Sequence, residues 1–121
     1  MWQSLSVVEA FSADQVWLTI PEVAERLGVP LGRVHRLIED HHLIEVKRDG
    51  VRKVPVEAIA GNEPLPSLRG TILVLLDAGF SIEGAIEWLY TSNDVLGTTP
   101  MLALVAGKKA EIRRLAQALA L

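Results

Sequence analysis

The stretch from residue 19 to residue 28 carries a full set of signals for a short helix and its end. Thr19 and Glu22 have the Thr-x-x-Glu spacing of a capping box, and Pro21 lies in the first turn, where proline is tolerated. Gly28 supplies the left-handed residue that ends such a helix. Apolar residues repeat at helical spacing and predict one buried face: Ile20, Val23, Ala24 and Leu27.

A second helix begins almost at once, because Pro30 fixes its first turn only two residues after Gly28. Its predicted inward residues are Leu31, Val34, Leu37 and Ile38. Its predicted outward residues are Gly32, Arg33, His35 and Arg36. Two short helices joined so tightly must cross steeply, which is the geometry of a helix-turn-helix.

A β-hairpin is predicted directly after the second helix. Two β-prone runs, Ile44–Arg48 and Val51–Val54, flank Asp49-Gly50. A two-residue Asp-Gly loop favours a type I′ turn, in which both central residues have positive φ. Pro55 ends the second run, and residues 56–60 are expected to start a short helix. The order of elements is that of a winged helix-turn-helix.

Residues 17–59 resemble the DNA-binding domain shared by MerR-type regulators and phage excisionases. The motif is LTIPEVAERLGVP, followed by RVHRLIEDHHLI and a short basic wing. The whole chain is similar to a narrower actinobacterial family of small winged-helix DNA-binding proteins, known from mycobacteria as kinase substrates. In that family a C-terminal helical domain follows the wing, here carrying PSLRGTILVLLDAGF and EWLY. The resemblance implies binding of duplex DNA.

The second half of the chain reads as four helical segments after a short linker at residues 61–66. A helix capped by Ser67 spans residues 68–78, and its run Ile72–Leu76 is apolar on nearly all sides. The next helix follows Ser81, with Trp88 and Tyr90 off its buried stripe of Ile82, Ala85, Ile86 and Leu89. Segments at 99–106 and 108–120 complete the set. The last one has an inward stripe of Ile112, Leu115, Ala116 and Leu119.

The predicted fold is therefore mostly α: a winged helix-turn-helix with a short β-hairpin wing, followed by a small C-terminal helical subdomain. The predicted division is an N-terminal segment at 1–16, the winged helix-turn-helix at 17–60, and a helical domain at 67–121 packed on it. A chain of 121 residues, half of them hydrophobic, can bury such a core without cross-links. No cysteine is present, and the longest apolar run is too short for a membrane span. We expect a soluble, cytoplasmic, nucleoid-associated protein with no membrane contact.

Net charge is the main objection to DNA binding, because the chain carries −3 at neutral pH. Residues 17–60 carry seven basic and seven acidic side chains, but the basic ones are clustered. A local basic patch can bind phosphate even when the net charge is negative. The predicted DNA-binding residues lie on the second helix and around the hairpin tip: Arg33, His35, Arg36, Lys47, Arg48, Arg52 and Lys53.

Each of these groups has a simpler interpretation. Arg36 can pair with Asp40 at i+4, leaving an ordinary solvated helix face. The wing cations can merely protect the edges of a small hairpin. The outward residues of the last helix, Lys108, Lys109, Arg113 and Arg114, can form a second DNA contact or a solvated face. The alternative function is a protein-interaction module that keeps the winged fold and binds a partner through its C-terminal helices.

Metal binding and catalysis are not expected. His41 and His42 are adjacent at a helix end and cannot converge readily on one ion together with His35. A cationic histidine is favoured at a helix C-terminus, which explains these residues more simply. No phosphate loop or nucleophile elbow is present, so we expect a non-enzymatic protein without a cofactor.

Two protein partners are predicted besides duplex DNA. The apolar run at 72–76, with Trp88 and Tyr90, can support a homodimer through the C-terminal helices, or can be covered by the final helix in a monomer. The resemblance also implies a serine/threonine kinase as a partner. The N-terminal segment offers Ser4, Ser6 and Ser12, where phosphorylation would add negative charge near the DNA-binding face.

Overall fold

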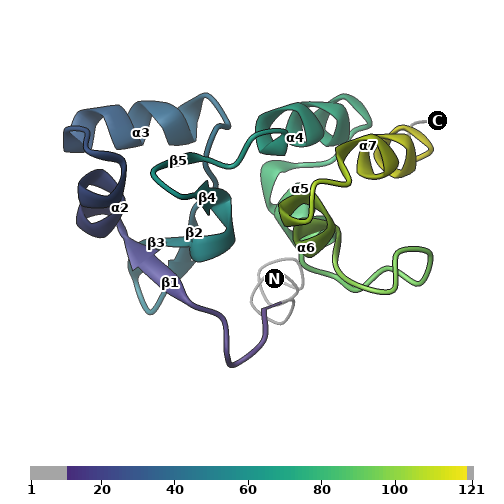
Figure 1. The fold of residues 1–121 in the computed structure, drawn as a ribbon, viewed down its shortest axis with the longest axis horizontal. Helices are drawn as coiled ribbons and strands as arrows, with labels where there is room; N and C mark the ends of the chain where they lie inside the picture. The colour runs from purple at the N-terminus through teal and green to yellow at the C-terminus, as the bar shows by residue number, and fades with distance from the viewer. Residues whose placement is uncertain (1–10, 120–121) are drawn as a thin grey trace. The chain divides into compact units, whose positions relative to one another are not determined.

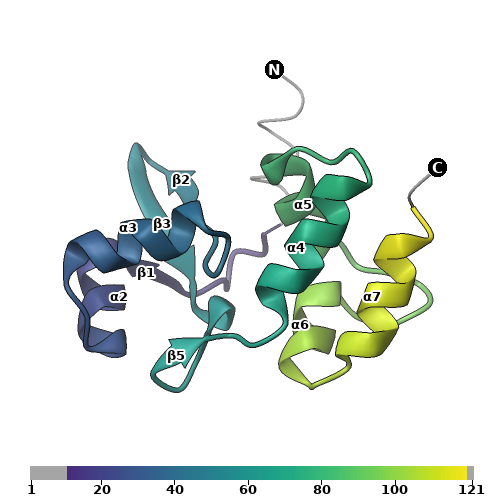
Figure 2. The same cartoon turned by 90° about the horizontal axis from the view of Figure 1, so that it is seen from above.

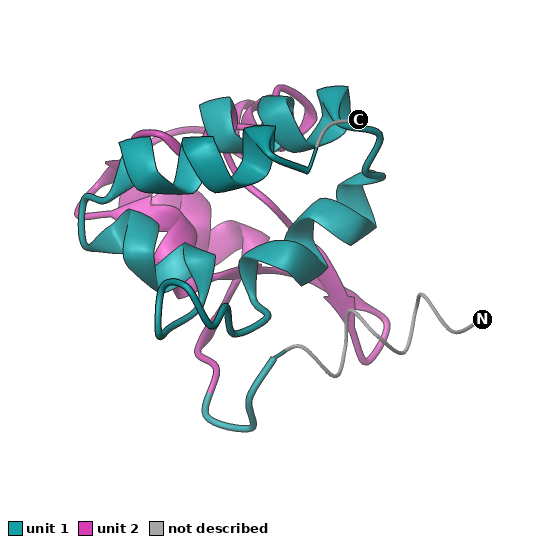
Figure 3. Ribbon diagram, turned by 90° about the vertical axis from the view of Figure 1, so that its right-hand side faces the viewer, with its two compact units in different colours: residues 1–14, 70–121 teal, residues 15–69 magenta. Residues whose placement is uncertain are grey.

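The computed structural model describes residues 11–119 and divides the chain into two compact units. One unit comprises residues 15–69, and the described part of the other comprises residues 11–14 and 70–119 (Figure 3). The fold class predicted from the sequence is confirmed: a winged helix-turn-helix with a hairpin wing comes first and a group of short helices follows it (Figure 1). The domain limits of 17–60 and 67–121 stay a prediction.

In the first unit, helices α2 (Ile20–Leu27) and α3 (Leu31–Glu39) precede the hairpin strands β2 (Val46–Arg48) and β3 (Val51–Pro55). Strand β1 (Trp17–Thr19), which the sequence analysis did not predict, adds to the other edge of β3 and gives the sheet order β1-β3-β2. Helix α2 packs against α3 and against β1 and β3 (Figures 1 and 2). The hairpin is therefore anchored to the helices through its second strand.

The predicted helix signals are confirmed in detail. The Thr19 hydroxyl accepts from the Glu22 backbone N–H, and the Glu22 carboxylate accepts from the Thr19 N–H, completing the capping box. Gly28 ends α2 at φ 70°, and its N–H and that of Val29 donate to carbonyls of the last turn. The chain can therefore turn sharply into α3.

The stretch expected to be a helix and then a linker is more ordered than predicted. Only residues Val56–Ala58 are helical, as a 3₁₀ turn (η1), and the chain then enters strand β4 (Ile59–Ala60). Strand β5 (Glu63–Pro64) pairs back on β4 through a turn in which Gly61 has φ 68°. Residues 61–64 therefore belong to a second small hairpin of the first unit, and the linker prediction is wrong for these residues.

The helices of the second half are α4 (Leu68–Asp77), α5 (Ile82–Leu89), α6 (Pro100–Val105) and α7 (Lys109–Gln117). All four were predicted. Ser81 and Thr99 cap α5 and α6 by accepting from backbone N–H groups. The fully buried residues of this unit include Ile72, Leu75, Leu89, Met101 and Ile112. The predicted end of the last helix, at Ala120, lies outside the described residues.

Three predicted burial assignments are wrong. Leu31 was expected to face inward but is 50% exposed, because it precedes the first inward-facing position of α3, Val34. Leu119 was expected in the core but is 39% exposed, because α7 ends at Gln117. Tyr90 was expected to lie off the buried stripe but is buried, with its ring centroid 4.3 Å from that of Phe11.

Candidate nucleic-acid interface

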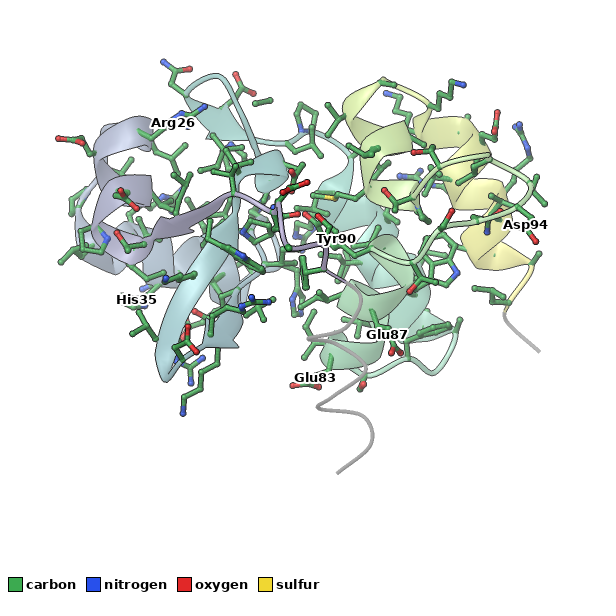
Figure 4. The ribbon with its side chains drawn as sticks, turned by 90° about the horizontal axis from the view of Figure 1, so that it is seen from below. Arg26, His35, Glu83, Glu87, Tyr90 and Asp94 are labelled. Atoms are coloured by element: carbon green, nitrogen blue, oxygen red, sulfur yellow. The ribbon has the colours of Figure 1, made fainter. Side chains whose placement is uncertain are left out.

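The outward face of α3 carries the three candidate residues predicted there. Val34 and Leu37 are buried and fix which side of the helix faces the core. Arg33, His35 and Arg36 are all exposed as a result, and the His35 ring projects away from the ribbon in Figure 4. A helix held in this way can present two guanidinium groups and an imidazole to a partner.

The simpler interpretation of Arg36 requires an ion pair with Asp40. Within residues 11–119 the structure contains one ion pair, and it does not involve α3. Asp40 instead ends α3, and its carbonyl accepts from Arg69 Nε at 2.9 Å. Arg33 and Arg36 therefore have no carboxylate partner in the described part of the chain.

The first turn of α3 adds two features that the sequence analysis did not select. The side chain of Leu31 is half exposed and lies in the same helical turn as the exposed Arg33. Gly32 has ordinary helical backbone, and a Cβ built on it would come within 4 Å of no side chain from elsewhere in the described part of the chain. Neither turn geometry nor internal packing therefore requires glycine at this position. The sequence did contain a signal for Gly32, because the helical spacing already placed it on the outward face of the helix.

The wing closes through the predicted turn. Asp49 and Gly50 have φ of 54° and 81°, as a type I′ turn requires. The register pairs Lys47 with Arg52, Arg48 with Val51, and Val46 with Lys53. Because side chains alternate along a strand, Lys47 and Arg52 share one face of the hairpin and Arg48 and Lys53 share the other. The four predicted wing cations are thus divided between two faces.

Two of the wing cations already have partners within the first unit. Arg52 Nη1 pairs with Glu45 Oε1. The Arg48 Cζ atom lies 5.0 Å from the ring centroid of Trp17, in a cation–π contact. Lys47 is exposed and has no ion pair among residues 11–119. The cations of the wing are therefore not equivalent.

Lys53 lies on the same hairpin face as Arg48, opposite Thr19 of β1. The Thr19 N–H donates to Glu22 Oε1 at 2.7 Å, and this bond holds the pKa of the Glu22 carboxyl below its usual value. The Thr19 hydroxyl adds to this effect, and the positive charge of Lys53 adds a smaller part. The positive charge of Lys53 therefore acts on the Glu22 carboxylate of the capping box as well as on solvent.

Trp17 and Glu45 were missed as partners of the wing cations. The signal for Glu45 was available, because it lies two residues before Lys47 and the Asp-Gly turn sets Lys47 opposite Arg52. No local signal pointed to Trp17. Its approach to Arg48 depends on β1 joining the sheet.

The basic residues of the second unit are arranged differently. Lys108, Lys109, Arg113 and Arg114 are exposed, as predicted. Arg113, however, lies against α4, since a Cβ placed on Gly70 would come within 2.7 Å of its Nη2 atom. On α5, Glu83 and Glu87 are one helical turn apart (Figure 4). The expected basic stripe of α7 is thus partly used for packing.

No group of three or more His, Asp or Glu side chains in residues 11–119 could hold a metal ion. His41 follows the C-cap residue of α3 with φ 66°, and the N–H of His42 donates to the Leu37 carbonyl at 2.9 Å. The histidine pair is thus part of the end of a helix. None of the described helices combines the length and hydrophobicity that a membrane span requires.

Comparisons with known families match both halves of the chain. Residues 7–58 match the wHTH domain of DNA-binding protein Rv2175c, and residues 65–120 match the Rv2175c C-terminal domain of unknown function. DNA-binding protein Rv2175c of Mycobacterium tuberculosis is 30% identical over 125 aligned positions, covering 93% of this chain and 86% of that protein.

A second relative matches only the first half. An excisionase of Streptomyces ambofaciens is 45% identical over 42 residues, covering 35% of this chain and 68% of that protein. Among solved structures, the NMR structure of Rv2175c superposes with a TM-score of 0.83 at 29% identity, covering 92% of this chain and 85% of that one. The similarity therefore extends over both units.

Proposed function

The chain belongs to the family of DNA-binding protein Rv2175c, and from this premise we propose that it binds duplex DNA through the outward face of α3 and the wing. The observation that carries the proposal is the pair of arginines on α3. Arg33 and Arg36 are exposed, have no carboxylate partner among the described residues, and lie on a helix whose opposite side is fixed in the core. That is the arrangement of a recognition helix.

In this proposal the first turns of α3 enter the major groove. Arg33 and Arg36 contact phosphates or guanine edges, and His35 donates from its ring to an acceptor nearby. Gly32 allows the helix backbone to approach the DNA closely, since no side chain projects there. Leu31 offers an apolar contact of the kind that a thymine methyl group makes.

The wing residues Lys47, Arg48, Arg52 and Lys53 contact the adjacent backbone or minor groove. Their engagement is unequal, because Arg52 and Arg48 must leave or share partners that they already have. Phosphate contacts by these groups release condensed counterions from DNA. Binding should therefore weaken steeply as salt is added.

A titration of a random-sequence duplex of about two helical turns, followed by fluorescence anisotropy at several salt concentrations, tests the proposal. The expected result is saturable binding whose log–log salt slope corresponds to several phosphate contacts. A 13.2 kDa protein that remains folded and shows no salt-dependent binding would overturn it. A sequence-selected duplex then distinguishes a transcriptional regulator, with a large specificity ratio, from a nucleoid-associated factor, with a small one. Either role places the protein in the cytoplasm, at the nucleoid.

A second candidate function is protein association through the C-terminal helices, including a homodimer. The supporting observation is that Leu102 and Val105, one turn apart on α6, are each 51% exposed. Tyr90 no longer supports this function, since it packs on Phe11. Light scattering at micromolar concentration tests the homodimer: twice 13.2 kDa supports it, and one chain mass with and without DNA contradicts it.

Kinase regulation also remains a proposal. Ser12 is exposed, whereas Ser4 and Ser6 lie outside the described residues. A phosphate added in this segment would repel DNA electrostatically if the segment lies near the bound duplex. Glutamate at all three positions should then weaken duplex binding, and unchanged affinity would exclude the mechanism.

A further inference from the structure

The carboxylate of Glu45 occupies a distinct place in the wing. It makes the ion pair found among residues 11–119, and its partner is one of the candidate DNA-binding cations, Arg52. The Glu45 side chain is only 19% exposed, whereas that of Arg52 is 64% exposed. The carboxylate is therefore held against the protein, and the guanidinium extends towards solvent from it.

Strand geometry explains why a carboxylate is useful here. Lys47 and Arg52 lie directly opposite each other on one hairpin face. Like charges at such a position destabilise a hairpin. Glu45 precedes Lys47 by two residues, which keeps it on the same side of the chain as this pair. Its negative charge offsets the repulsion and lowers the net charge of this face from +2 to +1.

We propose that Glu45 sets the affinity of the wing for DNA by competing with phosphate for Arg52. This inference rests on the proposed function. When the duplex binds, a phosphate oxygen must replace the Glu45 carboxylate as the acceptor for Arg52. One ion pair is exchanged for another, so Arg52 adds less to affinity than its position at the wing suggests. Lys47, which has no carboxylate to leave, makes the stronger contact on this face.

The exchange also has an electrostatic consequence. After Arg52 turns to the phosphate, the Glu45 carboxylate remains a few ångströms from a negatively charged backbone and repels it. Both effects act in the same direction. Removing the negative charge at position 45 should therefore raise affinity for DNA, whereas most substitutions in a binding site lower it.

The decisive variant is Glu45→Gln, which keeps the shape of the side chain and removes its charge. We expect binding to a random-sequence duplex to tighten by about two- to fivefold, as the loss of one exposed ion pair allows. The log–log salt slope should change by less than about one, because Arg52 contacts a phosphate in both complexes.

Glu25→Gln provides the matched control. Glu25 is exposed on α2, and its loss changes the net charge by the same amount. Any increase in DNA affinity that both variants share comes from the change in net charge. The inference is therefore tested by the difference in DNA affinity between Glu45→Gln and Glu25→Gln. Arg52→Gln should weaken wild-type binding only slightly. In an Arg52→Gln background the gain from Glu45→Gln should be clearly smaller than in the wild type, because the competition for Arg52 is gone and only the direct repulsion of the backbone is relieved.

Glu45→Asp tests the contact without changing the charge. The shorter side chain should loosen the pair with Arg52 and give a smaller gain than Glu45→Gln. Thermal unfolding of every variant establishes that the compared proteins are folded, and Glu45→Asp supplies the comparison if Glu45→Gln is not.

Three results overturn the inference. Glu45→Gln can bind no more tightly than Glu25→Gln, or its gain can be undiminished in an Arg52→Gln background. It can also bind more weakly than the wild type, which would make Glu45 a residue that positions Arg52 for DNA. If any of these three results is found and the wild-type protein still binds duplex, the inference about Glu45 fails and the proposed DNA-binding function stands. Wild-type protein that fails to bind overturns both.

Discussion

Gly32 of α3 and Gly70 of α4 both lie inside helices, one in each unit, and the space beside them is used differently. Beside Gly70 of α4, the space that a side chain would take is occupied by the guanidinium of Arg113. Beside Gly32 of α3, none of residues 11–119 fills it. Glycine costs helix stability by up to about 1 kcal/mol relative to alanine, so its presence calls for a reason. Packing supplies the reason in α4, and for α3 we propose that the reason is close approach of the DNA.

The arginines of the two units differ in the same way. Arg113 lies against a neighbouring helix of its own unit, whereas Arg33 and Arg36 extend from α3 without a carboxylate partner among the described residues. Basic content alone therefore does not identify a DNA-binding surface. Our proposal for α3 therefore rests on exposed arginines that lie beside unfilled space, and not on basic content.

The largest effect is expected from Arg33→Ala combined with Arg36→Ala. Each arginine contact to a base or phosphate is worth about 1–3 kcal/mol, so losing both should weaken duplex binding by roughly thirtyfold or more. Anisotropy measures the affinity, and far-UV circular dichroism establishes that the helices remain.

The control for this double variant is Arg113→Ala combined with Arg114→Ala, which removes two arginines from α7 in the second unit. We expect less than a twofold change in affinity from it, since one of its arginines packs on α4. A large loss in this pair as well would mean that the second unit also binds DNA, and the contrast between the units would fail.

A smaller loss is expected when Lys47, Arg48, Arg52 and Lys53 are all replaced by Gln. Binding to every duplex sequence should weaken by a similar factor, about tenfold, and the log–log salt slope should become shallower by at least about one. The affinity of several unrelated duplexes at three salt concentrations measures this. A loss confined to one sequence would show that the wing reads bases.

Gly32→Ala should separate stability from binding. Without a partner the added methyl group meets nothing, so the free energy of unfolding should rise by about 0.5–1 kcal/mol. Duplex binding should weaken severalfold, because the methyl group keeps the helix away from the groove. Denaturant unfolding and anisotropy give the two values.

Gly70→Ala is the comparison for this variant. Its methyl group displaces only the flexible end of Arg113, so DNA affinity should stay at the wild-type value. Equal affinity of Gly32→Ala and wild type would mean that the first turn of α3 lies away from the duplex.

The smallest effect concerns the helix caps. The pKa of Glu22 is lowered by its bond from the Thr19 N–H, so the carboxylate stabilises the folded protein above pH 4.5 and this contribution is lost as the pH falls through the lowered value. The cap of α5 has Gly84 where α2 has Glu22, so it has no carboxylate at the capping-box position, and Glu83 lies one residue earlier in the first turn. Glu22→Gln should therefore reduce the acid sensitivity of thermal unfolding, whereas Ser81→Ala should lower stability equally at pH 7 and pH 4. A Glu22→Gln protein with an unchanged pH profile would contradict this assignment.

Much of the first unit could be predicted because its signals are local. The capping box at Thr19, the helix end at Gly28 and the turn at Asp49-Gly50 each depend on backbone groups within a few residues. The outward positions of Arg33, His35 and Arg36 followed from the same helical spacing. Leu31 was wrongly predicted to be buried, because the apolar periodicity of a helix does not show where the neighbouring elements stop covering it.

The sequence by itself determined the helices, the wing turn and the positions of the basic residues along them. Tertiary structure decided which of those residues are engaged: Arg48 on Trp17, Arg52 with Glu45, and Arg113 on Gly70. It also decided that β1 joins the sheet and that Phe11 packs on Tyr90. The physical reason is that turns and caps are stabilised by hydrogen bonds within a few residues. Most of the contacts that engage a side chain join segments far apart in the chain, and they form only when those segments pack together.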